Sequence, residues 1–363
     1  MLARIQHTLG QRLSGLPHFA DPSTGQWTTS PDGDWTGGHF VGQLWLAARD
    51  DDRYRRHADL YARRLDGREG SPTIFRGFLF HYGAALGAHL FDDQSAWERA
   101  VRGARGLVAA YNPKAGIIPL GTGAEEARDI GDSETSIDAV GAVSALLSAA
   151  AERTGDVAMH DAAVEHARRH IEICVRTDGS VAQSGTVDPR TGAIVRRYSH
   201  KGHSATSTWA RAQAWAMLAF TMSARWLPAN PEFLAAAIRV SDWWMAHVPD
   251  DLVAFWDFDD PAIPSTNRDT SGTAIAAAAL LKLAALVPDG GQRYREFAVR
   301  TVHALVTDHL RPVPGLPGQI AVLGSGCYNK LTNLAPRHEL VWGSYYLLEA
   351  LTVLDDGLDP LAV

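Results

Sequence analysis

The sequence predicts an all-α protein, an (α/α)6 barrel made of six helical hairpins. Two observations support this fold class. Six segments that are apolar on nearly every side, and rich in Ala and Gly, alternate with six amphipathic segments. A single hairpin of this kind leaves its apolar face uncovered, so the six bury it only by packing together, and a closed ring does so. A curved open solenoid would show the same alternation and remains an alternative.

The apolar segments are the expected inner helices, at 37–49, 76–90, 133–153, 207–227, 270–287 and 338–354. The expected outer helices lie at 2–14, 51–66, 97–111, 157–176, 231–244 and 292–311. Asn230-Pro231 is a clear start signal, a capping residue followed by proline at the first helical position. In 181–198, VAQSGTV and AIVRR flank DPRTG and predict a β-hairpin. Since no Pro/Gly/Ser-rich linker divides the chain, residues 1–363 are predicted to form a single domain.

The composition excludes several classes of protein. With 363 residues, 46% hydrophobic content and a net charge of −7, the chain has ample core and lacks the basic surface that nucleic acid requires. No segment could span a bilayer and the N-terminus reads as an amphipathic helix, so we expect no membrane partner and a cytoplasmic location. Cys174 and Cys327 lie outside any metal-ligand spacing, so neither a metal site nor a disulfide framework is expected. The oligomeric state is not predicted.

The alternation also predicts where a site would form. If inner and outer helices strictly alternate, every inner helix runs in the same direction and all six N-termini share one rim. Polar and aromatic residues gather there: Trp35, His39, Glu134, Asp138, Trp209, Arg211, Arg268, Asp269, Arg337 and His338. Helix N-termini favour anions, and Arg211 and Arg268 are the candidates for binding a carboxylate with two hydrogen bonds. An anionic small molecule is therefore the expected ligand.

Simpler interpretations exist for the same residues. Trp209, Trp215 and Trp256 have flat faces that suit sugar rings as well as a protein core. Arg211 lies in an apolar helix and must be paired, so a structural salt bridge with Asp257 or Asp269 is an alternative to a substrate role. Asp138, one turn inside an apolar helix, is either a partner of the helix dipole or a working acid/base. The loop histidines His200 and His203 are expected to form hydrogen bonds rather than to bind a metal.

Several strings together resemble a known family. They are WTGGHFVGQLW (35–45), SIDAV (136–140), STWARAQAW (207–215), FWDFDDPAIPSTNRDTSGTAIAA (255–277), GCYN (326–329) and ELVWGSYYLLEAL (339–351). In this order, from about residue 30 to the end, they resemble the unsaturated glucuronyl hydrolases of the glycoside hydrolase family 88 type. The resemblance implies an (α/α)6 barrel and an enzyme without metal or cofactor. Its implied substrates are oligosaccharides with a 4,5-unsaturated uronic acid at the non-reducing end.

The resemblance also implies a mechanism. Asp138 matches the aspartate that protonates C4 of the vinyl ether and activates the water that attacks C5, after which the hemiketal opens and releases the aglycone. One residue is thus first acid and then base, unlike the paired carboxylates of ordinary glycosidases. Trp209, Arg211 and Trp215 match residues that hold the sugar and its carboxylate. The remaining substrate-binding candidates are Trp35, His39, Gln183, His200, Lys201, Arg268, Tyr328 and Trp342.

The chain departs from the family pattern in its pocket. Where the family has a second acidic residue, in His-Asp-x-Gly-Phe, this chain reads IFRGF, with Phe75 in the acidic position. Gln183 stands for a substrate-contacting histidine, Lys201-Gly202 for Gln-Gly, Ala212 for glycine and Cys327 for serine. These changes leave a second hypothesis open: a hydratase, isomerase or cyclase acting on an unsaturated small molecule of specialised metabolism, or a binding homologue without turnover. The retained Asp138 favours acid/base chemistry.

Overall fold

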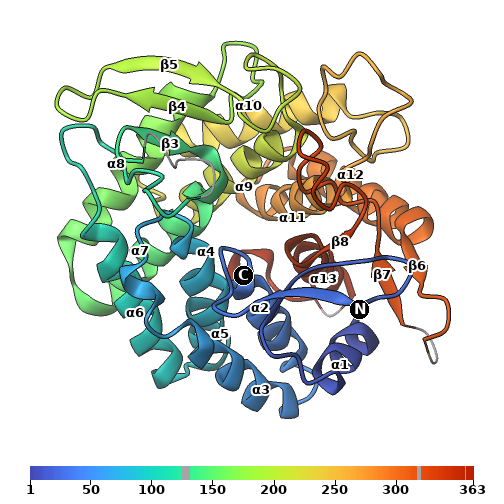
Figure 1. Ribbon diagram of the computed structural model, residues 1–363. Coiled ribbons are helices and arrows are strands. Elements are labelled where there is room, and N and C mark those ends of the chain that lie inside the picture. The colour runs from blue at the N-terminus through green and yellow to red at the C-terminus, as the bar shows by residue number, and fades with distance from the viewer. Residues whose placement is uncertain (125–130, 317–319, 356) are drawn as a thin grey trace.

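Helices dominate the computed structural model, which describes residues 1–124, 131–316, 320–355 and 357–363. Figure 1 shows them arranged in a ring around a common centre. The inner helices are α2 (Gly37–Ala47), α4 (Arg76–Phe80) continued by a π-helical turn (His81–Ala85) and α5 (Leu86–Phe91), α7 (Val140–Thr154), α9 (Ala210–Trp226), α11 (Thr270–Leu286) and α13 (Val341–Asp355). The outer helices are α1 (Leu2–Gly10), α3 (Arg53–Ala62), α6 (Gln94–Val108), α8 (Val157–Cys174), α10 (Pro231–His247) and α12 (Gly291–Ala304).

The inner helices form a closed ring. Helix α2 packs against the second inner helix, which packs against α7; α7 packs against α9, α9 against α11, α11 against α13, and α13 again against α2. Each of α3, α6, α8, α10 and α12 covers the inner helix that it follows or precedes in the chain. The contact between α13 and α2 excludes an open solenoid, and the (α/α)6 barrel predicted from the sequence is confirmed.

Small residues let the inner helices approach closely. Helix α11 is buried along nearly all of its length and is largely alanine on every side. Between α2 and the second inner helix the backbones themselves touch, because a Cβ atom at Gly38 would collide with the carbonyl oxygen of Phe78. Only glycine allows this approach. It holds the N-terminal ends of these two helices together at the rim.

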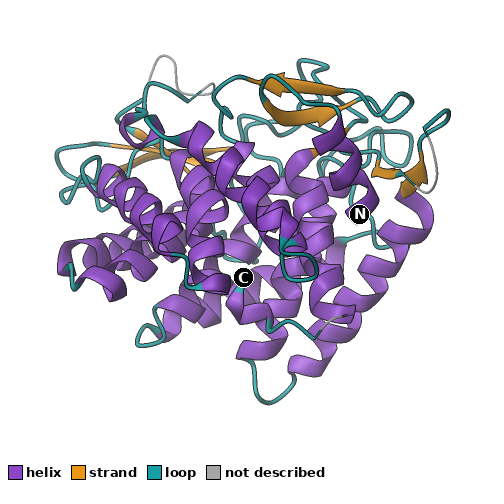
Figure 2. Ribbon diagram, turned by 90° about the horizontal axis from the view of Figure 1, so that it is seen from below, coloured by secondary structure: helices purple, strands orange, loops and turns teal. Residues whose placement is uncertain are grey.

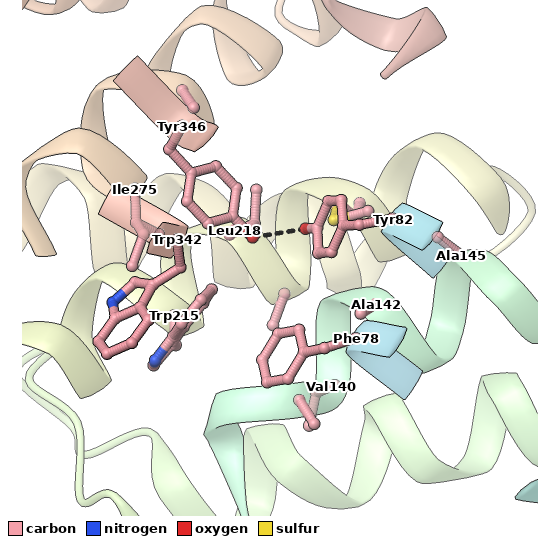
Figure 3. Close-up of a cluster of buried hydrophobic side chains, with 14 of the residues drawn as sticks. Phe78, Tyr82, Val140, Ala142, Ala145, Trp215, Leu218, Ile275, Trp342 and Tyr346 are labelled. Atoms are coloured by element: carbon pink, nitrogen blue, oxygen red, sulfur yellow. Dashed lines mark hydrogen bonds between the residues drawn. The ribbon is translucent and has the colours of Figure 1, made fainter. Parts of the chain in front are cut away.

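Aromatic side chains fill the middle of the ring, so the barrel is a packed core and not a pore. Figure 3 shows Phe78, Trp215 and Trp342 beside the hydroxyl-to-hydroxyl hydrogen bond of Tyr82 and Tyr346, 2.5 Å long. Burial raises the pKa of both phenols. Deeper polar groups are also paired: the Tyr345 hydroxyl donates to Glu349 (2.8 Å), which forms an ion pair with Lys282 (2.8 Å). These pairs make a polar core tolerable.

Short strands cover part of the helices (Figure 2). The sheet β3-β4-β5 contains β3 (Glu134–Ser136), β4 (Ser184–Val187) and β5 (Ile194–Tyr198), all antiparallel, so the hairpin predicted over 181–198 is confirmed. A second sheet has the order β2 (Trp27–Ser30), β1 (Leu16–Ala20), β8 (Glu339–Leu340). The third pairs β6 (Leu310–Pro312) with β7 (Ala321–Leu323).

Several predicted helix limits are wrong, and the strands explain two of them. The helix expected from 133 begins with a short 3-10 turn at Ile137, because 134–136 pair with β4. The helix expected from 338 begins at Val341 after β8. The N-terminal helix ends at Gly10 rather than 14, and the outer helix predicted to 311 leaves α-geometry after Ala304 in a π-helical turn.

One continuous cluster of buried apolar side chains extends from Ile5 to Leu358. The assignment of 1–363 to a single domain stays a prediction. In the part of the chain that the structure describes, every helix is too short or too polar to cross a membrane. The cytoplasmic location predicted above likewise stays a prediction.

Several buried histidines have low pKa values, and we therefore expect acid to destabilise the fold. Burial lowers the pKa of His18 and His170 to about 4, of His39 and His81 to about 3, and of His166 well below its usual range. In the unfolded chain each returns to about 6.5. Below about pH 6.5 the unfolded chain binds protons at these histidines, whereas the folded protein keeps them neutral because their pKa values are lower. The stability that they contribute is therefore complete above about pH 6.5 and is lost as the pH falls toward 4. The free energy of unfolding should drop by on the order of 1–2 kcal/mol per histidine between pH 7 and pH 5.

Urea denaturation at pH 7, 6 and 5 measures this drop. His81→Gln should make the pH dependence less steep by about one proton. His303→Gln serves as the control, because His303 is solvent-exposed. A stability that stays constant from pH 7 to pH 5 would contradict the argument.

Candidate functional site

A cavity opens where the N-terminal ends of the inner helices meet. Among the described residues its walls are formed by Trp35, Phe75, Phe78, Asp138, Lys201, Trp209, Arg211 and Trp215. Lys201 comes from the loop between β5 and α9, and the other side chains come from the N-terminal parts of α2, α4, α7 and α9 or from the residues just before them. The structure therefore brings together six of the predicted site residues, at the shared rim that the helix alternation predicts.

Asp138 is held by the strand pairing that precedes α7. It lies in the 3-10 turn Ile137–Ala139, where its backbone N–H donates to the Ser136 hydroxyl at 3.3 Å. Ser136 pairs with Ser184 in the β3-β4 ladder, which places Gln183 next to the carboxylate. The Gln183 side-chain amide donates to Asp138 Oδ2 at 3.0 Å. With 8% of its surface exposed, Asp138 is a buried carboxylate that faces a cavity.

Gln183 also links Asp138 to the opposite loop. Its Oε1 accepts a hydrogen bond from the backbone N–H of Lys201 at 3.0 Å. One amide side chain thus fixes both the acid/base candidate and the backbone that carries the lysine. Gln183 is absent from the cavity lining in the described part of the chain, so its observed role is to orient Asp138 rather than to line the pocket.

The Lys201 backbone is further constrained by its neighbour. A Cβ atom at Gly202 would lie 2.5 Å from the Ser207 hydroxyl and 3.0 Å from Asp257 Oδ2, so any side chain at this position would displace these two hydrogen-bonded groups. The lysine side chain is 6% exposed, and its Nζ lies 5.1 Å from the centroid of the Tyr328 ring. Lys201 is thus a buried residue of the cavity lining whose ammonium lies over the face of the Tyr328 ring.

Aromatic rings make up the remaining wall. Trp35 stacks at a tilt on Trp342, with ring centroids 4.7 Å apart, and also contacts Phe75 (6.0 Å) and Phe78 (5.6 Å). Phe78 in turn lies 5.0 Å from Trp215. Phe75 thus puts carbon atoms into the cavity wall, at the position for which the family resemblance implies a carboxylate.

Arg211 forms a buried salt bridge with Asp269, one of the two partners that the sequence analysis considered. Its Nη1 lies 2.5 Å from Asp269 Oδ2, and the two side chains are 1% and 0% exposed. Nη1 also donates to the carbonyl of Cys327 and Nη2 to that of Tyr328, both at 2.6 Å. The alternative of an ion pair with Asp269 is confirmed, and the guanidinium is held by protein acceptors. Arg211 also belongs to the cavity lining with Asp138, so its expected role as a carboxylate partner stays a prediction.

Arg268 lies away from the cavity, contrary to the expectation that it might assist Arg211. Its Nη2 pairs with Asp251 at 2.6 Å, and its guanidinium covers the ring of Phe255. The cause is local. Residues 268 and 269 are in extended backbone before α11, where successive side chains point to opposite sides, and Asp269 points inward.

The other predicted residues lie behind the wall or beside it. Tyr328 accepts a hydrogen bond from Trp35 Nε1 at 3.3 Å, and Trp342 supports the same ring. His39 is fully buried, with Nδ1 3.2 Å from the Thr36 carbonyl and its ring stacked on Tyr82. His200 contacts the Ser184 hydroxyl at 3.0 Å through Nδ1. Among the described residues of the cavity lining none of these four occurs, and their substrate-binding roles stay predictions.

Sequence reasoning missed Phe78 as a lining residue and treated Phe75 only as a departure. The available signal was their spacing: residues three apart at a helix start share a face. Asp257, the other partner considered for Arg211, instead accepts hydrogen bonds from the His203 N–H and the Ser207 hydroxyl. No group of His, Cys, Asp and Glu suited to a metal ion occurs in the described ranges.

Known proteins resemble this chain in both sequence and fold. No protein-family model matches the chain. The chain is 32% identical to the unsaturated glucuronyl hydrolase of Bacillus sp. (strain GL1), over 98% of this chain and 94% of that protein. The crystal structure of the unsaturated glucuronyl hydrolase from Bacillus sp. GL1 matches with a TM-score of 0.91, 30% identity and coverage of 99% and 96% of the two chains. A structure of a UGL variant with dGlcA-Glc-Rha-Glc matches equally well, with a TM-score of 0.91 and 30% identity.

Replacing Arg211 tests its structural role. Arg211→Gln leaves the Asp269 carboxylate buried without its cation, which should cost about 3–5 kcal/mol of stability, measured by denaturant unfolding. Arg53→Gln is the matched control, because its side chain is 80% exposed and its ion pair with Asp51 adds little. An Arg211→Gln variant as stable as the parent protein would contradict the structural assignment.

Proposed function

The chain belongs to the unsaturated glucuronyl hydrolase family, and on this basis we propose that it hydrates the vinyl ether of a 4,5-unsaturated uronic acid at the non-reducing end of an oligosaccharide or glycoside and releases the aglycone. The observation that carries the proposal is Asp138, a buried carboxylate oriented by Gln183 in an aromatic cavity. The UGL variant structure described with dGlcA-Glc-Rha-Glc supports the substrate class.

The residues of the cavity fit each part of this reaction. The flat faces of Trp35, Trp209 and Trp215 suit the C–H faces of a sugar ring. Asp138 gives its proton to C4 of the double bond, and positive charge develops at C5 and the ring oxygen. The same carboxylate, now ionised, takes a proton from the water that attacks C5. The resulting hemiketal opens, the aglycone leaves, and Asp138 is again protonated.

The geometry of Asp138 supports such a dual role. The Gln183 amide holds Oδ2, and the Ser136 hydroxyl holds the backbone of the same residue, so the carboxyl group has a fixed plane. A fixed acid/base needs no reorganisation between the two proton transfers. The negative charge that Asp138 gains on protonating C4 also stabilises the cationic transition state.

Phe75 supports a second candidate. Its ring packs against Trp35 and Phe78 where the family resemblance implies a second acidic residue. A cavity with one carboxylate and a larger apolar wall also suits an unsaturated small molecule other than a uronide, handled by a hydratase, isomerase or cyclase, or bound without turnover.

Asp138→Asn tests the proposed acid/base. The substitution keeps the size of the side chain and its capacity to accept the Gln183 hydrogen bond, so the fold should be retained. Turnover of an unsaturated glucuronyl disaccharide, followed by the loss of its ultraviolet absorbance, should fall by a factor on the order of 10²–10⁴. Asp132→Asn, at a solvent-exposed position nearby, should leave turnover unchanged. Equal rates for the Asp138→Asn variant and the parent would rule out this role.

Phe75→Asp tests the departure from the family pattern. If the protein is a hydrolase with an altered pocket, restoring a carboxylate should raise activity on the same disaccharide. Phe75→Asn is the matched uncharged control. The new charge is buried and can cost several kcal/mol, so thermal unfolding must be measured alongside. If the parent is inactive on every unsaturated uronide tried, and a folded Phe75→Asp variant is equally silent, the second candidate function replaces the first.

A further inference from the structure

Helix α8 supports the short strand that leads to Asp138. The helix packs against β4 and β5 (Figure 1), and a Cβ atom at Gly185 would lie 2.3 Å from the side chain of Ile173. Gly185 pairs with Thr135 of β3. The outer helix thus lies directly against the sheet at the pair that contains Thr135, three residues before the acid/base candidate.

A row of buried polar side chains on α8 faces this contact. His166, His170 and Cys174 recur at four-residue steps on one side of the helix, and all three are 0% exposed. His170 Nε2 lies 2.8 Å from the Thr135 hydroxyl. Cys174 Sγ lies 3.9 Å from the carbonyl oxygen of Gln183. Two of the three side chains therefore contact β3 or the residue that precedes β4.

The direction of the hydrogen bond between His170 and Thr135 follows from the other ring nitrogen. His170 Nδ1 lies 2.7 Å from the carbonyl oxygen of His166, which can only accept, so Nδ1 carries the proton. Burial lowers the pKa of His170 to about 4, so the ring is neutral near pH 7 and Nε2 is an acceptor. The Thr135 hydroxyl therefore donates to His170, and its contact with the Ile118 carbonyl, at 3.5 Å, is the longer alternative.

This bond holds β3 in a direction that the strand pairing does not. The ladder to β4 fixes the three-residue strand within the sheet, whereas side chains stand roughly perpendicular to a sheet, so the Thr135 bond fixes it against α8. Only Ser136 and Ile137 separate Thr135 from Asp138, and the Ile137 N–H donates to the Gln183 carbonyl at 3.0 Å. A displacement of β3 would therefore move the Asp138 carboxylate relative to the Gln183 amide that orients it.

We propose that His170 is a positioning residue for the acid/base Asp138 and acts through the Thr135 hydroxyl and β3. The inference rests on the proposed function, because it concerns the residue that transfers the proton in that reaction. His170 is absent from the described lining of the cavity, so it neither binds the substrate nor exchanges a proton with it. Its contribution is to keep the carboxylate where it reaches C4, and the rate of an acid/base step depends steeply on such placement.

Thr135→Val tests the connecting hydrogen bond, because valine keeps the shape of threonine and removes the hydroxyl. We expect kcat on an unsaturated glucuronyl disaccharide to fall by roughly 10- to 100-fold, the size of effect that a misplacement of about 1 Å produces. KM should change little, because the side chains that line the cavity are untouched. His170→Leu should show the same split between kcat and KM. His170→Gln, which places an acceptor near the position of Nε2, should keep most of kcat.

A double-mutant cycle separates positioning from a purely structural role. If the hydroxyl acts through Asp138, Thr135→Val should lower the residual kcat of the Asp138→Asn variant by less than about 2-fold, because the group that it positions is already lost. An equal loss of kcat in both backgrounds would overturn the inference, since the hydroxyl would then support the protein as a whole.

Thr301→Val is the matched control. Thr301 is also buried, and its hydroxyl donates to the Phe297 carbonyl at 3.0 Å on the outer helix α12. The substitution should lower the thermal stability and leave kcat of the folded protein unchanged. A folded Thr135→Val variant that keeps the kcat of the parent contradicts the role of His170.

The proposed function can fail separately. A parent protein that turns over no unsaturated uronide contradicts the hydrolase assignment itself, and this inference falls with it, because there is then no acid/base to position. An active parent whose kcat is matched by both Thr135→Val and His170→Leu leaves the hydrolase assignment intact and contradicts only the role of His170.

Discussion

The ion pair between Arg211 and Asp269 is the contact on which the geometry of the site depends. It joins α9 to α11, and the hydrogen bonds of Arg211 to the carbonyls of Cys327 and Tyr328 add the segment that leads to α13. Asp269 also caps α11 through the Ser271 N–H and accepts from the Cys327 N–H. Since each partner is buried, neither can be lost without leaving an uncompensated charge. Three of the six inner N-termini are thereby fixed, and one of them, that of α9, carries Trp209, Arg211 and Trp215 of the cavity wall.

Two charged residues of the cavity lining, Asp138 and Lys201, lie outside the regular helices. Asp138 occupies a 3-10 turn, and Lys201 lies in the loop that follows β5. Gln183, the residue before β4, is hydrogen-bonded to both. Rigid helices thus carry short segments whose backbone is fixed by a few directed hydrogen bonds, a common arrangement for functional residues. The buried histidines belong to the same support, because His170 contacts the Thr135 hydroxyl of β3 at 2.8 Å.

The sequence predicts the barrel well because the alternation of apolar and amphipathic helices follows directly from burial. The ring closure, by contrast, depends on the contact of α13 with α2, which no local pattern encodes. The hairpin over 181–198 has a turn signal between two β-rich runs, whereas β3, β6 and β8 have two or three residues and show no alternation. For Arg211 the sequence shows only that a partner must exist. Its choice of Asp269, and the outward direction of Arg268, follow from extended backbone that the helical period does not describe.

Phe75 and Lys201 both make the cavity more positive than the family pattern implies. Relative to the family pattern, a carboxylate is replaced by a phenyl ring and an amide by an ammonium, so the formal charge becomes more positive by two. Both changes favour an anionic ligand, because one removes a repulsion and the other adds an attraction. An attraction of this kind acts on the substrate as well as on the transition state, so it strengthens binding without by itself accelerating the proton transfer. In the proposed reaction the rate would then depend on Asp138 and on the hydrogen bond from Gln183 that orients its carboxylate. Phe75 and Lys201 therefore change the charge of the cavity in the same direction, while the proposed acid/base, Asp138, is retained. This pattern fits a change in substrate binding better than it fits two independent losses of function.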